Sequence, residues 1–413
     1  GSMQGCHFEA AFGIRLLRGL GSQYHYSALG QEFAGAFWVI GHTYGRQYLH
    51  DRPDVDNADL LFTLGWNGMQ SHQMPQAPLM LRRFSKDKDK LLIVVDPRKT
   101  ETAQLADIHL PIRPGTDSLL IKAMISIILK EGWENKNYLE THTNGFDRVR
   151  SYFEDFDARR AIQVCELDFD EVYKVTRLYA TRKSALRNDL GIFMGRHGAL
   201  NSYLIVILQS ICGRLCTPGG NVIPGHMMPI GSHSDENNPK TWRTVATDSF
   251  PVCGVFPPNV MPEEIMTNHP ERLRAVLVAG ANPLRSYADT TAYENAFGQL
   301  DLLVTAEIAM TETAALSHYI LPSRSGYESW DSTFFPFTYP GVHFQMRRPI
   351  VEPEGEQLEL GEIHLRIADK LGLIPQIPDY LYQAAMEDRT TFAQALMKYI
   401  AAEPTAFKAM PFI

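Results

Sequence analysis

Residues 91–111 read LLIVVDPRKTETAQLADIHLP, and residues 302–322 repeat the same pattern as LLVTAEIAMTETAALSHYILP. Aligned without a gap, the two segments share nine identical residues, including Thr-Glu-Thr-Ala and a closing Leu-Pro. Each begins with an apolar run that ends on an acid, Asp96 or Glu307, and then continues through a polar turn. The pattern predicts a β-strand with an acid at its carboxyl end, followed by the start of a helix at Thr-Glu-Thr-Ala.

A related pattern lies upstream of each copy. Residues 58–71 (ADLLFTLGWNGMQS) and residues 275–286 (AVLVAGANPLRS) both contain an apolar run that leads into Gly-x-Asn. Strands that alternate with helical segments are typical of βαβ units and of a parallel sheet. In such folds ligands bind outside the carboxyl ends of the strands, where an acid can accept hydrogen bonds from ribose hydroxyls. The repeat therefore predicts an α/β protein with two nucleotide sites.

The composition is that of a globular protein of more than one domain. The chain has 413 residues, of which 45% are apolar and 21% charged, so we expect two domains. Its net charge of −8 disfavours nucleic acid as a partner. Because no apolar run approaches the length of a membrane-spanning helix, we expect a soluble protein without membrane insertion by this segment. A cytoplasmic location is expected, with a periplasmic one left open.

The five cysteines are widely scattered, which is typical of reduced thiols rather than of a disulfide framework. Cys212 and Cys216 could share one helical face at a spacing of four residues. No second pair lies nearby in the sequence, so buried core thiols are favoured over a metal site.

Two further segments contain candidate ligand contacts. Residues 113–117 (RPGTD) lead into a predicted helix, where Asp117 could accept hydrogen bonds from the ring N–H and amino group of guanine or could simply cap the helix. Residues 192–194 are read as a strand that ends at Gly195, and a tight turn needs glycine even without a ligand. A boundary between domains is placed near residue 226, where the chain becomes rich in proline and polar residues.

The order and spacing of these motifs resemble the molybdopterin oxidoreductases of the dimethyl sulfoxide reductase type. The resemblance runs from about Gly41 to Leu373. It is based on Gly-x-Asn at Gly65 and Gly280, Asp-Pro-Arg at Asp96, and the late block Thr313-Ala314 with Leu321-Pro322 and Glu328, besides the Arg-Pro-Gly-Thr-Asp segment at 113–117.

The resemblance implies two related Rossmann-like domains with parallel sheets flanked by helices. It divides the chain into residues 1–226, residues 227–375 and a C-terminal tail, 376–413. Each domain would hold one of two molybdopterin guanine dinucleotides around a molybdenum or tungsten atom. The first would contact Gly65, Asn67, Ser71, Asp96, Arg98, Gly115 and Asp117; the second Gly280, Asn282, Ser286, Glu307 and Thr311; Gly195 and His226 would lie near the dithiolene end.

Several residues depart from the family pattern. Gly68 stands where the first Asn is usually followed by Pro, His318 replaces an acid of the second copy, and Ala306 replaces a polar residue. The second dinucleotide is therefore expected to be held less firmly. Four closely spaced cysteine ligands for an iron–sulfur cluster are not present, and the usual C-terminal capping domain is not recognised. We therefore expect the central part of a larger enzyme, with little or no turnover by this chain alone and any 4Fe-4S cluster in a missing N-terminal domain.

The metal ligand is not identified by the resemblance. Family members use Cys, selenocysteine, Ser or Asp, and the corresponding segment offers Ser27 or Glu32, although polar helix surface explains both equally well. Formate dehydrogenases pair a Cys or selenocysteine with a following His and place an Arg near Pro224, and neither feature is found. Formate oxidation is therefore disfavoured.

The leading functional hypothesis is a two-electron oxidoreductase of anaerobic metabolism that acts on an unknown small molecule, with an electron-transfer subunit as a possible partner. A hydratase or lyase on the same metal-pterin scaffold is the first alternative. A noncatalytic scaffold that has lost the cofactor is the second.

Overall fold

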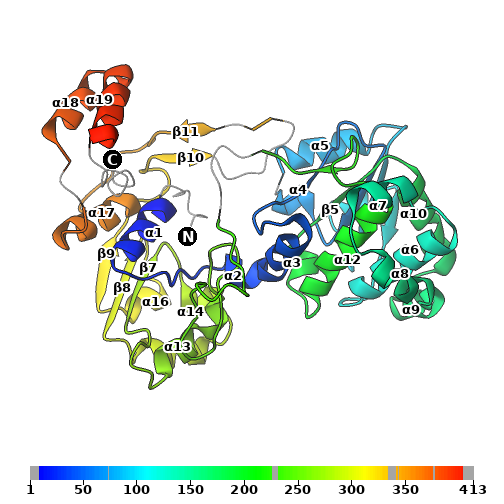
Figure 1. Cartoon of the computed structure of the whole chain (residues 1–413), viewed down its shortest axis with the longest axis horizontal. Coiled ribbons are helices and arrows are strands. Elements are labelled where there is room, and N and C mark those ends of the chain that lie inside the picture. The colour runs from blue at the N-terminus through cyan, green and yellow to red at the C-terminus, as the bar shows by residue number, and fades with distance from the viewer. Residues whose placement is uncertain are drawn as a thin grey trace.

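The computed structural model describes residues 9–72, 74–225, 231–333, 341–342, 344–374 and 377–402. Within these ranges the chain forms two α/β units that lie side by side (Figure 1). One parallel sheet, flanked by helices, is found in each unit.

The first sheet has the order β4-β3-β2-β5, and all its neighbouring strands are parallel. These strands are β2 (Leu60–Leu64), β3 (Leu91–Val95), β4 (Ile108–Leu110) and β5 (Ser184–Asn188). All five residues of β2 are buried, as expected for a central strand covered on both faces. Register pairs the end of β2 with the ends of β3 and β5, so the loops after these strands leave from one edge.

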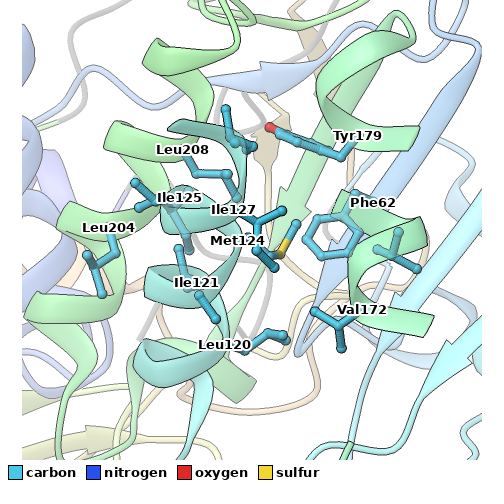
Figure 2. Packing of buried hydrophobic residues seen from close by; sticks show 14 of the residues in the cluster. Phe62, Leu120, Ile121, Met124, Ile125, Ile127, Val172, Tyr179, Leu204 and Leu208 are labelled. Carbon is cyan, nitrogen blue, oxygen red and sulfur yellow. The ribbon is translucent and has the colours of Figure 1, made fainter. Parts of the chain in front are cut away.

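Alternate side chains of this sheet enter two different cores. Phe62 packs with α6 (Asp117–Lys130), α10 (Phe169–Thr181) and α12 (Gly198–Ile211), as Figure 2 shows. Leu61 points to the other face, against α5 (Ala77–Phe84). The remaining helices of this unit are α3 (Ala34–Tyr44), α4 (Gly68–Ser71), α7 (Lys136–His142), α8 (Asp147–Glu154), α9 (Ala158–Val164) and α11 (Leu190–Phe193).

The second sheet has the parallel order β7-β8-β9. Its strands are β7 (Ala275–Ala279), β8 (Leu302–Glu307) and β9 (Tyr319–Pro322). One face packs against α13 (Met261–Met266) and α15 (Thr290–Phe297), and the other against α17 (Leu360–Lys370). The order repeats β2-β3-β4 of the first sheet, so the repeated sequence folds into a repeated structure.

The Thr-Glu-Thr-Ala segments form single turns rather than the beginnings of longer helices. The first copy contains a 3-10 turn at Ala103–Leu105, and the second contains α16 (Glu312–Ala315). Both turns are short because a third parallel strand, β4 or β9, begins only a few residues later. The sequence did not indicate these third strands.

The predicted strand at residues 192–194 is wrong. The strand of this region is β5, and residues 190–193 form the helical turn α11. The Asp189 carboxylate accepts a hydrogen bond from the Leu190 N–H at 2.9 Å, which starts the helix directly after β5.

The N-terminal helix α1 (Glu9–Gly19) packs on the second unit, against α17 (Figure 1). A Cβ added at Gly361 would lie 2.9 Å from a ring carbon of Phe12, which shows how closely the two helices approach. Residues 9–19 therefore belong with the second unit, unlike the predicted division at residue 226.

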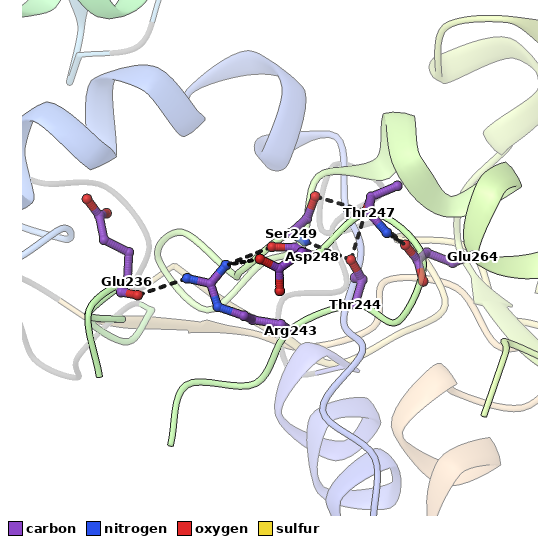
Figure 3. A network of polar contacts seen from close by, with 7 residues as sticks. All are labelled: Glu236, Arg243, Thr244, Thr247, Asp248, Ser249 and Glu264. Atoms are coloured by element: carbon purple, nitrogen blue, oxygen red, sulfur yellow. Dashed lines mark hydrogen bonds and ion pairs between the residues drawn. The ribbon is translucent and has the colours of Figure 1, made fainter. Parts of the chain in front are cut away.

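The segment between the units is fixed by a buried carboxylate, Glu264 of α13 (Figure 3). Its oxygens accept hydrogen bonds from the backbone N–H groups of Val245, Ala246 and Thr247 at 2.8–3.0 Å, and from the Thr247 hydroxyl. Four donors satisfy the charge of a side chain that is 1% exposed.

The remaining elements are short or peripheral. They are α2 (Leu29–Glu32), α14 (Pro283–Ser286), a 3-10 turn at Pro258–Val260, the pairs β1 (Arg52–Pro53) with β6 (Asn221–Val222) and β10 (Asp331–Thr333) with β11 (Gln345–Arg347), and the helices α18 (Asp379–Glu387) and α19 (Arg389–Ala402). Over the residues described, we find no helix with the length and apolar character that crossing a membrane requires.

Candidate functional site

Each sheet ends in a glycine turn of the same geometry. Gly65 follows β2 with φ +58° and donates its N–H to the Val95 carbonyl at 3.1 Å. Gly280 follows β7 with φ +52° and donates to the Ala306 carbonyl at 2.9 Å. Positive φ is easily adopted only by glycine, so both turns require it. Two of the predicted site glycines are therefore placed at equivalent positions.

Asn67 connects the first turn to the Thr-Glu-Thr-Ala segment. Its amide oxygen accepts the Thr102 hydroxyl at 2.8 Å, and its amide nitrogen donates to Glu101 at 2.7 Å. The Ser71 hydroxyl donates to the Asn67 carbonyl at 3.1 Å and so closes the turn of α4. The side chain of Asn67 is therefore already occupied by protein partners.

Asn282 repeats these contacts in the second unit. Its amide oxygen accepts the Thr313 hydroxyl at 2.7 Å, and its amide nitrogen donates to Glu312 at 2.7 Å. The Ser286 N–H donates to the Asn282 carbonyl at 2.9 Å, as the Ser71 N–H does to Asn67. The two Gly-x-Asn turns are thus fixed by one set of hydrogen bonds made twice.

Each of these glutamates is near an arginine, but the two arginines are not at equivalent positions of the repeat. Arg98 is 3.9 Å from Glu101 in the first unit and is largely exposed. Arg285 is 2.6 Å from Glu312 in the second unit, where its guanidinium and the Asn282 amide lower the pKa of Glu312 to about 2. Arg98 therefore contacts the Thr-Glu-Thr-Ala segment, with its charge directed toward solvent.

Two acids lie together at the carboxyl edge of the first sheet. Asp96 follows β3 and accepts the Arg98 N–H at 2.9 Å, and Asp117 begins α6 after β4. Burial raises the pKa of the Asp117 carboxyl; a backbone N–H lowers it in part, and the nearby Asp96 carboxylate raises it again. Gly115 precedes Asp117 with φ +79° and has open space where a Cβ would be. This edge therefore carries two partly buried carboxyl groups.

Two predicted contact residues of the second unit, Glu307 and Thr311, have hydrogen-bond partners in their own chain. Glu307 is 4% exposed, and its carboxylate accepts the Ile308 N–H at 2.7 Å. Thr311 is the N-cap of α16 and accepts the Ala314 N–H at 3.2 Å. Both predicted contacts of the second dinucleotide have local structural partners.

Gly195 lies beyond the turn that supports Gly65. The Gly191 N–H of α11 donates to the Gly65 carbonyl at 3.2 Å, and a Cβ on Gly191 would lie 2.5 Å from that oxygen. Gly195 itself is exposed, and nothing lies within 4 Å of the Cβ position. Of the two glycines, only Gly191 is shown in contact with the first turn.

The helix α2 lies between the two units (Figure 1). Its Gln31 amide donates to the Ser286 carbonyl of the second unit at 2.7 Å. On the other side, Phe33 packs on Phe193 of α11, with ring centroids 5.2 Å apart. Residues 31–33 thus contact both α11, which packs against the Gly65 turn, and Ser286, which ends the Gly280 turn.

The two predicted candidates on this segment differ in environment. The Ser27 hydroxyl accepts the Leu29 N–H at 3.3 Å, a contact typical of a residue that starts a helix. Burial raises the pKa of the Glu32 carboxyl, and the Asp189 carboxylate raises it further. The Asp189 carboxylate therefore disfavours a negative charge on Glu32, and Glu32 is the stronger candidate of the two. The third candidate, His226, lies outside the described residues.

Sequence reasoning missed Asp189 and its partner Arg187. Asp189 is buried at the end of β5, and its carboxylate lies 3.5 Å from the Arg187 guanidinium. Arg187 also stacks over the Trp66 ring at 5.4 Å, beneath the first glycine turn. The only signal in the sequence is the charged pair within the short segment 184–189, which reads as a surface turn.

His318, which departs from the family pattern, accepts a backbone hydrogen bond, as Asp107 does at the equivalent position of the first unit. The Leu92 N–H donates to the Asp107 carboxylate at 2.8 Å, and the Leu303 N–H donates to the His318 Nδ1 at 2.9 Å. Both side chains accept the same hydrogen bond from the central strand of their sheet. The replacement is therefore not a change in a cofactor contact.

We expect His318→Asp to unfold at the same urea concentration as the parent protein, because aspartate performs this role at position 107. His318→Ala should lose about 1 kcal/mol of unfolding free energy, since the Leu303 N–H loses its side-chain acceptor. Urea unfolding followed by circular dichroism measures both. If both variants lost the same unfolding free energy, the hydrogen bond from the Leu303 N–H would not contribute to stability.

The cysteines form no metal centre in the part of the chain that is described. Cys212 is buried, and burial raises the pKa of its thiol to about 12. Cys216, by contrast, is exposed in a turn with φ +54°. The expectation of a buried thiol is confirmed for Cys212 and is wrong for Cys216.

Comparison with known proteins gives the following similarities. Residues 1–370 match the family described as molybdopterin oxidoreductase. The F420-dependent formate dehydrogenase subunit alpha of Methanocaldococcus jannaschii is 30% identical over 77% of this chain and 48% of its own length. Formate dehydrogenase H of Escherichia coli is 27% identical over 77% of this chain and 46% of its length. The chain thus spans about half the length of the curated relatives it matches.

Among solved structures, the acetylene hydratase from Pelobacter acetylenicus is similar, with a TM-score of 0.73 and 20% sequence identity. The match covers 88% of this chain and 54% of that structure. At this level of identity the similarity concerns the fold alone.

Proposed function

Because the chain belongs to the molybdopterin oxidoreductase family, we propose that it holds a molybdopterin-bound molybdenum or tungsten atom between its two units, for two-electron redox chemistry on a small molecule. The observation that supports this most directly is the duplicated Gly-x-Asn turn with its matched hydrogen bonds to Thr102 and Thr313. The equivalent turns at Gly65 and Gly280 lie on either side of α2, and we propose that each binds one half of a paired ligand.

The first unit fits the guanine dinucleotide form of the cofactor. The Asp96 and Asp117 carboxylates lie together at the sheet edge, and within the described residues neither is in an ion pair. Guanine offers its ring N–H and amino group as donors, and ribose offers two hydroxyls. We propose that the glycine turn at Gly65 faces the pyrophosphate. We propose that Asp117 accepts from the base and Asp96 from the ribose.

When bound, the metal-pterin group supplies the electron transfer, and the protein supplies positioning and electrostatics. We propose that Glu32 is the protein group that faces the metal from α2. Its carboxyl holds a proton at pH values where an exposed glutamate has already lost it, because burial and the Asp189 carboxylate disfavour a second negative charge. Glu32 also affects Tyr287 of the second unit: burial, together with the Glu32 carboxylate, raises the pKa of Tyr287 to about 12.

Glu32 should make a pH-dependent contribution to stability. A carboxyl whose pKa is raised by folding destabilises the folded state once the pH exceeds its unfolded pKa. We therefore expect Glu32→Gln to raise the melting temperature at pH 7 and to leave it unchanged near pH 4. Asp189→Asn should lower the pKa of Glu32 in a carbon-13 NMR titration. A Glu32 pKa at the ordinary value in the parent protein would contradict this role.

A chemical determination of the bound group tests the proposed function. We expect the protein isolated under anaerobic conditions to contain molybdenum or tungsten together with a fluorescent pterin after oxidation. Ser27→Ala should leave the metal content unchanged, while Glu32→Ala should lower it or shift the X-ray absorption edge of the metal. Absence of both metal and pterin would overturn the proposal and would favour a noncatalytic scaffold.

We further propose that the intact protein works with an electron-transfer subunit. Three of the relatives are named as alpha subunits of formate dehydrogenases, which implies that those proteins have other subunits. Reduction of the bound metal by a candidate partner, followed optically, would support the proposal. A substrate that turns over without any redox change of the metal would instead favour a hydratase or lyase.

A further inference from the structure

The first unit contains a cavity that is separate from its glycine turn. The cavity has a volume of about 360 Å³ and lies between residues 52–56 and α5, with Lys90 in its wall. Because Lys90 directly precedes β3, this is the amino edge of the sheet, whereas Gly65 and Asp96 follow the carboxyl ends of their strands. None of the residues assigned above to the cofactor lines this cavity.

One wall of the cavity is fixed by the side chain of Lys90. Its ammonium donates to the Val55 carbonyl at 3.0 Å and to the Asp56 carbonyl at 3.1 Å, and it lies 4.9 Å from the centre of the Phe84 ring. These contacts connect residues 55–56 to the end of α5. The protein therefore forms this wall with its own hydrogen bonds.

The lining of the cavity is largely apolar. Met74, Met80 and Phe84 contribute to it, and all three also pack on the core between α5 and the sheet. Thioether groups are polarizable and adapt to the shape of an apolar ligand. Cavities of about 300–1,000 Å³ with such a lining and a few polar groups are typical of small-molecule sites.

Two arginines give the cavity positive charge. Arg83 is exposed, and its side chain forms no hydrogen bond or ion pair with the residues that the structure describes. Arg52 donates to the Asp51 carbonyl at 3.3 Å. Burial and the nearby Arg187 guanidinium lower the pKa of Arg52 to about 9, although Asp51 and Asp189 raise it in part. An anion in the cavity would therefore be stabilised by both arginines.

Two exposed acids, Asp56 and Asp87, also line the cavity and limit the charge that a ligand can carry. Their carboxylates repel a second negative charge, which disfavours dianions such as sulfate. A carboxylate carries a single charge, and its two oxygens match the paired N–H donors of a guanidinium.

We infer that this cavity is a ligand site of its own, which binds a small molecule with one carboxylate and an apolar body. Arg83 donates to the carboxylate, Arg52 adds positive charge, and Met74, Met80 and Phe84 contact the apolar body. The site shares no residue with the proposed cofactor site, so the inference goes beyond the proposed function and does not depend on it.

Calorimetric titration of the chain with benzoate tests the inference. We expect one site with a dissociation constant of about 1 mM or below. Benzamide, which has the same shape without the charge, should bind at least ~10-fold more weakly, and Arg83→Met should weaken benzoate binding by ~10-fold or more. The matched change Arg82→Met should leave benzoate binding unchanged, because Arg82 is exposed on the same helix and does not line the cavity.

A second pair of variants locates the site. Met80→Trp places a larger side chain in the cavity and should abolish benzoate binding, whereas Leu79→Trp, at a position that is 44% exposed and outside the cavity, should retain it. Circular dichroism confirms that each variant is folded. Absence of benzoate binding to the parent protein, equal binding of benzamide, or equal weakening by Arg82→Met would overturn the inference. The metal and pterin content of Arg83→Met should equal that of the parent, so failure of this inference and failure of the proposed function are measured separately.

Discussion

Gly65→Ala is expected to lower the free energy of unfolding by about 3 kcal/mol or more, because the substitution combines two unfavourable effects. The residue has φ +58°, a conformation that costs an L-amino acid roughly 1–2 kcal/mol. The added Cβ would also lie 2.9 Å from two backbone atoms, the Gly191 carbon and the Ile192 nitrogen. Backbone atoms of α11 cannot move away as a flexible side chain can, so the turn itself must shift.

Gly115→Ala serves as the matched control. Gly115 has φ +79°, but a Cβ at this position would have nothing within 4 Å. Its alanine variant should therefore lose only the conformational part, roughly 1–2 kcal/mol. Urea unfolding of the two variants measures the difference. If both lost the same free energy, the close approach of α11 to the first turn would have no energetic weight.

Glu264→Ala is expected to have the second large effect, about 3–4 kcal/mol of unfolding free energy. The buried carboxylate accepts hydrogen bonds from three consecutive backbone N–H groups, beginning at Val245, and from the Thr247 hydroxyl. Truncation leaves these donors without a partner at the junction of the two units. Glu263→Ala is the control, because Glu263 is exposed on the same helix and should change stability by less than about 0.5 kcal/mol.

The contribution of Glu264 should also depend on pH. Burial raises the pKa of its carboxyl, but the donors from Ala246 and Thr247 outweigh burial and hold the pKa below its usual range. A carboxyl with a lowered folded pKa stabilises the protein above its unfolded pKa and ceases to do so as the pH falls through the folded value. The stability difference between parent and Glu264→Ala should therefore shrink below about pH 4. A difference that stays constant down to pH 2 would contradict this assignment.

The sequence predicted the strands that are mostly apolar. Residues 60–64, in which Thr63 is the one polar residue, and residues 91–95 read as apolar runs because both faces of these strands are covered by helices. The strand at residues 184–188 was missed because it contains serine, arginine and asparagine. Two of its polar side chains find partners inside the fold: the Ser184 hydroxyl donates to the Tyr179 carbonyl at 2.6 Å, and Arg187 pairs with Asp189. A local pattern cannot show that such partners will be present.

The candidate site was predictable where its residues are close in sequence. The glycine turns and Asp96 follow their strands directly, so the motifs located them. The role of His318 was not predictable, because the sequence does not show that Asp107 accepts a backbone N–H rather than contacting a ligand. The electrostatic effect of Asp189 on Glu32 also required the structure, since it depends on how α2 crosses between the units.

The packing of α1 on α17 has a consequence for the order in which the protein forms during synthesis. The first unit is continuous in sequence, whereas the second combines residues 9–19 with residues that begin more than 200 positions later. On the ribosome, the first unit can therefore complete its sheet while α1 still lacks the surface that buries its apolar face. This helix joins its unit only after α17 has been translated, so closure of the second unit waits for the synthesis of residues 360–370.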